Sequence, residues 1–424
     1  MNAWIRLILL IAAFGGGACS EDSTDETDGD SERGDTDSDT ETENDFVPDP
    51  EGDVCNFSEP VPLGDPADDG MVLVPPNHPE IQYFGRVDCS DPAAPAFGFP
   101  GVTIRMRFEG DEVGFVLDDS GTATYPNFYN VVIDDQEPIV VKMEPGENTI
   151  TAATDLEDTE HTVEIFKRVE SNSGKGRGAF LGFRIPEGSE PLHLAPKPYR
   201  LEVVGDSISC GYGNEISVDD PTGYTYTTEN SNAYNAWGAI AARDLDAEYL
   251  ATAYSGRGIY RNYSGGGGET LPEMYLKSIP DGSSAIWDVH QFTPDVLVIN
   301  LGTNDFSPGL DVDTMDDAQA EFELTYLEFV ETLRSYYPQA VFILAVGPML
   351  SDGYPSGYRA LTRVRESLEA IVAARAADGD GDVHFLELPQ QSAPYGEDWH
   401  PTVATHMSMA GDLADLIDSL DLMQ

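Results

Sequence analysis

The spacing of hydrophobic and polar positions changes once along the chain, and the first pattern covers about residues 55 to 194. Apolar and polar residues alternate along 102–108, and a Glu-Gly-Asp turn follows at 109–111. A period of two predicts a β-strand, and turns of this composition predict antiparallel neighbours. Further strands are predicted at 112–117, 128–133, 138–141, 149–153, 161–166 and 180–185. Short strands at near-regular spacing indicate a β-sandwich of the jelly-roll type.

From residue 200 the pattern changes to apolar runs of strand length that alternate with longer segments of helical period. The predicted strands are 201–204, 247–253, 296–301, 340–346 and 383–386, and the predicted helices are 232–245, 316–336, 358–377 and 404–420. Apolar strands that alternate with helices predict a parallel sheet covered on both faces, a three-layer α/β fold. A proline-rich stretch at 191–198 separates the two patterns. We therefore expect a sandwich domain at 55–195 and an α/β domain at 196–424.

Residues 1–18 have the pattern of a signal peptide, in which Arg6 precedes a short apolar run and small residues follow. The run is too short to span a bilayer. Cys19 comes next, so this end resembles a bacterial lipoprotein signal with Cys19 as the lipidated residue, although Gly16 stands where such signals usually carry leucine. The rest of 19–54 is mostly Ser, Thr, Asp, Glu and Gly, which predicts a disordered tether. We expect an exported lipoprotein, attached to a bacterial membrane and located in the outer membrane or at the cell surface; a secreted protein with a spare cysteine is the alternative.

Charge and cysteine content limit the possible partners. The formal net charge is −55 over 424 residues. Such an acidic chain repels polyanions, which argues against nucleic acid as a partner and favours a neutral substrate. Cys55 and Cys89 lie in the same segment and are candidates for a disulfide in an oxidising compartment, whereas Cys210 is expected to be a packed thiol. No His and Cys residues have metal-ligand spacing, so no metal site is predicted.

Polar and small residues gather where strands of the predicted α/β sheet end. Open parallel sheets bind their ligands at the carboxyl ends of the strands, because the loops there share one edge. The residues that follow three of these strands, or that precede the last helix, are Ser207, Gly256, Asn304, Asp398 and His400. We expect them to meet at one site.

These residue types are suited to ester hydrolysis. A serine hydroxyl needs an adjacent base, and His400 is the candidate to take the Ser207 proton and return it to the leaving group. A carboxylate that orients the imidazole is expected at Asp398, with Glu397 as the alternative. A Ser–His dyad in which a backbone carbonyl holds His400 is the remaining possibility. The candidate oxyanion donors are the backbone amides of Ser207 and Gly256 and the side-chain amide of Asn304. Acyl transfer to serine and then to water requires no metal or cofactor.

Each residue also has a structural interpretation. Gly256 is compatible with a tight turn alone, and Asn304 and Asp305 are compatible with helix caps; for Asp305 we expect the structural role. The other histidines that compete for the role of the base are His406, which is compatible with a packed helix position, His290 and His384.

The order of these blocks resembles the SGNH (GDSL-type) hydrolases. Gly205-Asp206-Ser207 resembles their first block, Gly256 the second, Gly302-Thr303-Asn304-Asp305 the third and Asp398-Trp399-His400 the last. The usual last block has its acid three residues before the histidine, whereas here Asp398 is two before it. Asp-x-His-Pro with an N-terminal jelly roll is similar to carbohydrate esterase family 2. Further motifs that agree are Gly85-Arg86-x-Asp88, Phe108-Glu109-Gly110, His161-Thr162-Val163, Lys167-Arg168-x-Glu170, Gly182-Phe183 and Cys210-Gly211-Tyr212-Gly213.

The resemblance implies a flavodoxin-like sheet and the removal of O-acetyl groups from plant polysaccharides such as xylan and glucomannan. Trp399 and Trp287 are candidate platforms for sugar rings, with core packing as the alternative. Two other functions are compatible with the sequence. One is a broader acyl-ester hydrolase or lipase of the same superfamily, and the other is a sugar-binding surface lipoprotein without catalysis.

Overall fold

The computed structural model describes residues 55, 57, 59, 61–172, 176–220, 224–281 and 285–423. The predicted signal peptide, the predicted lipidation at Cys19 and the predicted acidic tether lie outside these residues.

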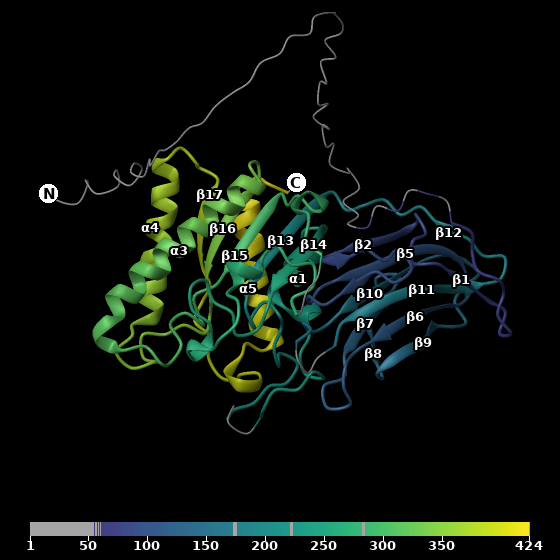
Figure 1. The fold of residues 1–424 in the computed structure, drawn as a ribbon, viewed down its shortest axis with the longest axis horizontal. Coiled ribbons are helices and arrows are strands. Elements are labelled where there is room, and N and C mark those ends of the chain that lie inside the picture. The colour runs from purple at the N-terminus through teal and green to yellow at the C-terminus, as the bar shows by residue number, and fades with distance from the viewer. Residues whose placement is uncertain are drawn as a thin grey trace, which may run out of the picture. The chain divides into compact units, whose positions relative to one another are not determined.

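The first domain is a sandwich of two antiparallel sheets (Figure 1). One sheet has the order β3-β4-β11-β6-β9, with β1 paired to β11, and the other has the order β12-β5-β10-β7-β8, with β2 paired to β5. The strands of the first sheet are β1 (Met71–Val74), β3 (Val87–Asp88), β4 (Ala96–Phe97), β6 (Val113–Asp119), β9 (Gly146–Ala153) and β11 (Gly178–Pro186). Those of the second are β2 (Ile81–Phe84), β5 (Thr103–Gly110), β7 (Phe128–Ile133), β8 (Ile139–Lys142), β10 (Thr159–Lys167) and β12 (Pro191–Leu192). The predicted all-β sandwich is confirmed.

Strand β5 shows how the alternating pattern builds this domain. Ile104, Met106 and Phe108 are fully buried in the sandwich core. Arg105 lies on the opposite face of the strand, because successive side chains alternate across a sheet. It is nevertheless buried, because it pairs there with Glu248 of the second domain. One face of β5 therefore forms the core, and the other contributes to the contact between the domains.

The second domain has a five-stranded parallel sheet with the order β14-β13-β15-β16-β17. Its strands are β13 (Tyr199–Gly205), β14 (Ala247–Ala253), β15 (Val296–Asn300), β16 (Val341–Val346) and β17 (Val383–Glu387). Its helices are α1 (Trp237–Asp244), α2 (Leu271–Met274), α3 (Met315–Tyr336), α4 (Ala360–Ala377) and α5 (Val403–Ser419). Short 3-10 turns are η2 (Ala233–Asn235), η3 (Tyr263–Gly265), η4 (Val289–Gln291), η5 (Val312–Thr314) and η6 (Glu397–Trp399).

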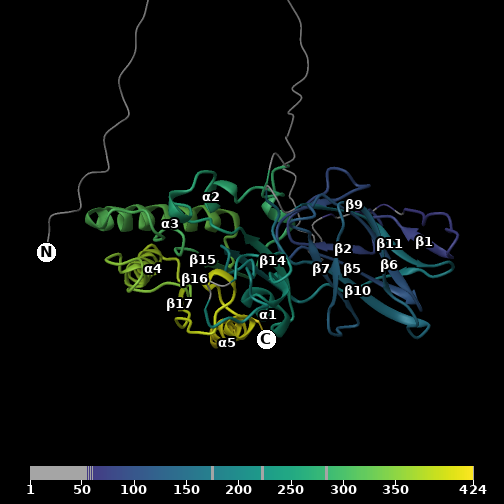
Figure 2. The same cartoon turned by 90° about the horizontal axis from the view of Figure 1, so that it is seen from below.

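Helices cover both faces of this sheet, as the sequence pattern predicts. Figure 2 shows α3 and α4 on one side and α1 and α5 on the other. The central strand β15 serves both layers: Leu297 and Ile299 pack in the cluster that includes α3 and α4, while Val296 and Val298 pack with α1 and α5. The predicted three-layer α/β domain is therefore confirmed.

Three arginines of the sandwich pair with three glutamates of the α/β domain. Neither side chain of the Arg86–Glu202 pair has any exposure, and the two charged groups are 3.3 Å apart. The other pairs are Arg105–Glu248 and Arg168–Glu215. Buried charges are tolerated only when they are paired and hydrogen-bonded. Each domain therefore supplies the counter-charges that the other needs.

Candidate active site

The strand register brings the predicted site residues to one edge of the parallel sheet. Gly205 at the end of β13 is level with Ala253 of β14 on one side and Asn300 of β15 on the other. The three loops that follow these strands, which carry Ser207, Gly256 and Asn304, therefore start side by side. This is the edge at which open parallel sheets bind their ligands.

Ser207 lies in a tight turn directly after β13. The carboxylate of Asp206 accepts the amide of Ile208 at 2.9 Å, and its carbonyl accepts the amide of Cys210 at 3.0 Å. A Cβ on Gly205 would lie 2.1 Å from the hydroxyl of Ser209, so the turn requires glycine there. This local structure presents Ser207 at the edge of the sheet.

The histidine expected to act as the base meets Ser207 directly. Nε2 of His400 lies 2.7 Å from the Ser207 Oγ, and the pair links positions 193 residues apart. The competing histidines lie elsewhere: His406 is buried in α5, where its Nδ1 accepts the Trp237 amide at 3.2 Å. His290 lies in η4 and His384 in β17. Of the four candidates, the structure places His400 against the serine.

The other imidazole nitrogen has a main-chain partner. Nδ1 of His400 is 3.1 Å from the carbonyl oxygen of Glu397, which also accepts the His400 amide at 2.9 Å. The Glu397 side chain is buried and accepts from the Thr227 amide at 2.8 Å and from the Asn230 side-chain amide at 2.7 Å. Glu397 thus fastens the turn whose carbonyl orients the imidazole. Glu397, the alternative candidate for the acid, therefore contacts the base through its backbone carbonyl and not through its carboxylate.

Asp398 has a different contact from the one predicted. Its carboxylate accepts the hydroxyl of Tyr212 at 2.7 Å, and the partner of the imidazole Nδ1 is the Glu397 carbonyl. The physical reason is local: Asp398 and Trp399 both have left-handed backbones, with φ of 49° and 63°. This conformation turns the carbonyl of the preceding residue, rather than the Asp398 side chain, toward Nδ1. The phenol ring of Tyr212 stacks on the imidazole, with centroids 4.1 Å apart and planes 24° apart.

Asn304 joins the loops around the serine. Its side-chain nitrogen donates to the carbonyl of Arg257 at 2.8 Å and to Asp206 at 3.2 Å. It therefore links the serine turn to the loop that carries Gly256, whose φ of +79° favours glycine. The amide predicted as an oxyanion donor has protein acceptors in this structure. The backbone amides of Ser207 and Gly256 have no protein acceptor within the described part of the chain.

Asp305 has the structural role expected of it. Its buried carboxylate accepts the backbone amides of Ile259, Tyr260 and Arg261 at 2.9–3.1 Å. These amides belong to the segment just after Gly256. Asp305 therefore fixes the second loop through three main-chain hydrogen bonds.

Burial sets the charge state of the site. Loss of hydration lowers the pKa of His400 to about 4, so the imidazole is neutral at neutral pH and able to accept a proton. Burial raises the pKa of Asp206 to about 7, and the nearby charge of Asp305 acts in the same direction. Burial likewise raises the pKa of Asp305 to about 6. The site thus favours neutral groups before the reaction begins.

The two tryptophans have opposite surroundings. Trp399 is 49% exposed and directly precedes the base. Trp287 is 2% exposed, and its ring lies 5.2 Å from the guanidinium carbon of Arg86 in the contact between the domains. Trp287 therefore has the core packing that the sequence left open as the alternative to a sugar platform. Its indole belongs to the packing around Arg86.

Sequence reasoning missed one contact of the base and left the other as an alternative without a named residue. Tyr212 belongs to a motif that carried the family resemblance, but nothing in its spacing indicated a ring stacked on His400. A backbone carbonyl that holds His400 was among the alternatives, but a carbonyl has no signature in the residue types, so the sequence did not assign this role to Glu397. Among the described residues, no group of three or more His, Cys, Asp or Glu side chains has the arrangement of a metal site, and no helix there is long and apolar enough to cross a bilayer.

The fold and the serine–histidine pair define the class of protein as a GDSL-like hydrolase with an N-terminal sandwich. Residues 203–412 match the GDSL-like Lipase/Acylhydrolase family, and residues 83–196 match the family described as Carbohydrate esterase 2 N-terminal. The chain belongs to carbohydrate esterase family 2.

Individual relatives agree with this assignment. An acetylxylan esterase / glucomannan deacetylase of Cellvibrio japonicus is 31% identical over 74% of this chain and 82% of the relative. Cellulase/esterase CelE of Acetivibrio thermocellus is 35% identical over 79% of this chain, which spans only 39% of that relative's length. A solved family two carbohydrate esterase from Clostridium thermocellum, in complex with cellohexaose, has a TM-score of 0.72 and 33% identity, over 81% of this chain and 99% of that one.

Proposed function

We propose that this protein removes O-acetyl groups from plant polysaccharides such as xylan or glucomannan through an acetyl-serine intermediate. The observation that carries the proposal is the 2.7 Å contact between the neutral imidazole of His400 and the Ser207 hydroxyl, at the ligand-binding edge of the sheet. The substrate class is supported by the Cellvibrio relative, an acetylxylan esterase / glucomannan deacetylase, and by the related esterase in complex with cellohexaose. The strongly negative chain also suits an uncharged glycan.

The first half of the reaction forms the acyl-enzyme. Oγ of Ser207 attacks the acetyl carbonyl carbon while its proton passes to Nε2 of His400. The backbone amides of Ser207 and Gly256 donate hydrogen bonds to the carbonyl oxygen and stabilise its negative charge. Asn304 contributes as the link between these two loops, and it acts as a third donor only when its amide exchanges one of its two present bonds, to Asp206 or to the Arg257 carbonyl, for the oxyanion. The C–O bond to the sugar then breaks, and His400 returns the proton to the departing hydroxyl.

The second half releases acetate. A water molecule gives one proton to His400 and attacks the acetyl carbon, so that a second oxyanion forms in the same place. When it collapses, the bond to Ser207 breaks and the proton on His400 restores the serine hydroxyl. The carbonyl of Glu397 holds Nδ1 of the imidazole throughout. The half-exposed ring of Trp399, beside the base, is the proposed platform for the sugar.

The test uses the full chain and its Ser207→Ala variant. We expect the wild-type protein to release acetate from acetylated xylan or glucomannan and to hydrolyse p-nitrophenyl acetate faster than longer acyl esters. Ser207→Ala should lose at least about a thousandfold in kcat with an unchanged melting temperature, because the attacking atom is gone while the fold is kept. Preference for long acyl chains would favour a broader acyl-ester hydrolase. Glycan binding without any acetate release would favour a sugar-binding protein.

We also propose that the protein is exported and attached to a bacterial membrane through a lipid on Cys19, at the outer membrane or the cell surface. The support is the sequence alone: a short apolar run after Arg6, small residues, and then cysteine. The acidic segment that follows has the composition of a spacer. Such an arrangement would bring the esterase to polymers outside the cell.

A further inference from the structure

The residue in closest stacking contact with His400 is Tyr212, which has no part in the chemistry described so far. Its ring covers one face of the imidazole at 4.1 Å between centroids. Its hydroxyl donates to the Asp398 carboxylate at 2.7 Å. The ring of Tyr226 lies 4.5 Å away at a tilt of 44°. Tyr212 is therefore held at both its hydroxyl end and its ring.

We propose that Tyr212 is a positioning residue for the base, and that Asp398 acts on His400 through the tyrosine. The proposal rests on the proposed esterase function, since it names how the base of that same site is held. The Glu397 carbonyl fixes the imidazole within its own plane, and the Ser207 hydroxyl lies at the opposite nitrogen. Neither contact prevents the ring from tilting out of that plane. The stacked phenol supplies this restraint.

The same arrangement favours the charged form of the base when it is needed. After His400 has taken the serine proton, an imidazolium lies over the negative face of an aromatic ring, which is attractive. The Asp398 carboxylate draws on the phenol proton and makes that ring richer in electrons. Its negative charge also favours the imidazolium, in opposition to burial. The benefit arises in the transition state, because the imidazole is neutral beforehand.

The contacts explain why an acid is present two residues before the base without touching it. The left-handed backbone at Asp398 and Trp399 gives the Nδ1 position to the Glu397 carbonyl. The Asp398 carboxylate, which does not contact Nδ1, accepts a hydrogen bond from the hydroxyl of Tyr212. Asp398 and Tyr212 form one unit, because each is the hydrogen-bond partner of the other.

The test is a double-mutant cycle with Tyr212→Phe and Asp398→Asn, to which Tyr212→Leu is added. Tyr212→Phe keeps the stacked ring and breaks the link to Asp398, whereas Tyr212→Leu removes both. We expect kcat for acetate release to fall by about 2- to 30-fold in Tyr212→Leu and by less in Tyr212→Phe, with little change in KM. The double variant should lose less than the product of the two single losses, because each change removes the charged hydrogen bond between the phenol and the carboxylate.

The pH profile separates this role from a merely structural one. Asp398→Asn should lower the plateau of kcat/KM and move its acidic limb to lower pH, because the carboxylate that favours the imidazolium is gone. Tyr83→Phe is the matched control: it also removes a tyrosine hydroxyl, one that donates to the Pro76 carbonyl at 2.6 Å in the sandwich. We expect Tyr83→Phe to change the melting temperature and to leave kcat and the pH profile unchanged.

The outcomes distinguish this proposal from the function on which it rests. If the wild-type protein releases no acetate, the proposed function fails. If the wild type is active, and a folded Tyr212→Leu variant has the same kcat and the same pH profile as the wild type, Tyr212 does not position the base. Additive losses in Tyr212→Phe and Asp398→Asn would show that Asp398 does not act through the tyrosine. Should Tyr212→Leu fail to fold, the cycle with Tyr212→Phe decides alone.

Discussion

At the scale of single residues, the surroundings of His400 determine the pH range in which the site works. The ring lies between Tyr212, the Ser207 hydroxyl and the Glu397 carbonyl. Loss of hydration lowers its pKa to about 4, although the Glu397 carbonyl and the charge of Asp398 act in the opposite direction. The general base must be neutral to accept a proton, so its working range begins well below that of an ordinary histidine, whose pKa is about 6.5.

We predict that kcat/KM rises with pH through a limb near pH 4, and that His400 contributes no further rise from about pH 5 to pH 8. The measurement is the initial rate of acetate release across this range, because kcat/KM reports the pKa of the free enzyme. A limb centred near pH 6.5 would contradict the prediction, since it would indicate an ordinary exposed histidine.

The same pKa directions set a control for that experiment. Burial lowers the pKa of His406 to about 3 as well as that of His400. Both histidines bind protons more readily in the unfolded chain than in the folded one. The folded state therefore has its full stability, as far as these two groups determine it, above pH 6.5, and loses stability as the pH falls toward 4 and 3. Enzyme held at each acidic pH should therefore be returned to pH 7 and assayed, so that loss of fold is separated from loss of the base.

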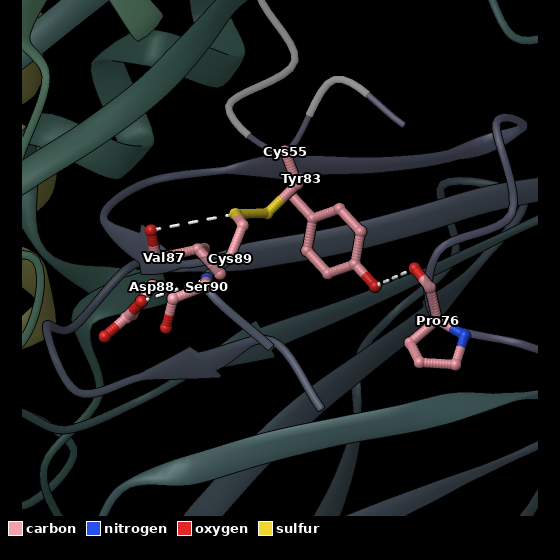
Figure 3. The surroundings of a disulfide bond; sticks show 7 residues. All are labelled: Cys55, Pro76, Tyr83, Val87, Asp88, Cys89 and Ser90. Atoms are coloured by element: carbon pink, nitrogen blue, oxygen red, sulfur yellow. Dashed lines mark hydrogen bonds between the residues drawn. A yellow bond between two sulfur atoms is a disulfide. The ribbon is translucent and has the colours of Figure 1, made fainter. Parts of the chain in front are cut away.

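At the scale of elements, a disulfide holds the start of the described chain against the sandwich. Cys55 and Cys89 are bonded, with their Cα atoms 5.7 Å apart, as the sequence allowed (Figure 3). Cys89 follows β3, and Cys55 is buried in the core cluster. In the same view the hydroxyl of Tyr83, from β2, donates to the Pro76 carbonyl. The bond is distant in sequence from every residue of the active site.

We predict that the double variant Cys55→Ser, Cys89→Ser loses stability and keeps activity. Closing a loop of 34 residues restricts the unfolded chain, and its removal should cost about 2–4 kcal/mol of unfolding free energy. Denaturant unfolding measures this loss, and kcat for acetate release should be unchanged. A variant as stable as the wild type would show that the bond adds nothing to the packing around it.

Element types were largely predictable from the sequence, and the exceptions have physical reasons. Long strands such as β5 and β10 and the helix α3 carry enough periods for their pattern to be read. The strands β3, β4 and β12 have two residues each, too few to show any period. The strand β8 was predicted from apolar residues, although Ile139 and Val140 are about half exposed at the edge of a sheet.

The site was predictable as far as side-chain chemistry follows from residue type and strand order. The pairing of His400 with Ser207 is of this kind, because parallel strands bring their loops to one edge. The contact at Nδ1 depends instead on the φ angles of Asp398 and Trp399, which no residue type specifies. The burial of Trp287 depends on a partner domain, so a local pattern cannot distinguish it from a surface platform.

At the scale of the whole molecule, the proposed anchor determines where the enzyme acts. We predict that Cys19→Ala releases the protein from the membrane fraction of a bacterial host, because a stable attachment through the lipid would be lost. Fractionation followed by an esterase assay of both fractions measures this. Solubilised wild type and variant should have equal kcat, which serves as the control. If the variant stays with membranes, the anchor is not at Cys19.

The three arginine–glutamate pairs between the domains have a consequence for how this protein can evolve and be engineered. A chimera that exchanged the sandwich for another one would leave Glu202 without Arg86 in a position closed to water, and breaking such a buried pair costs about 3–5 kcal/mol. A replacement sandwich would therefore have to supply an arginine opposite Glu202. A fusion partner is best joined upstream of Cys55, because all three arginine–glutamate pairs lie after that residue and stay intact.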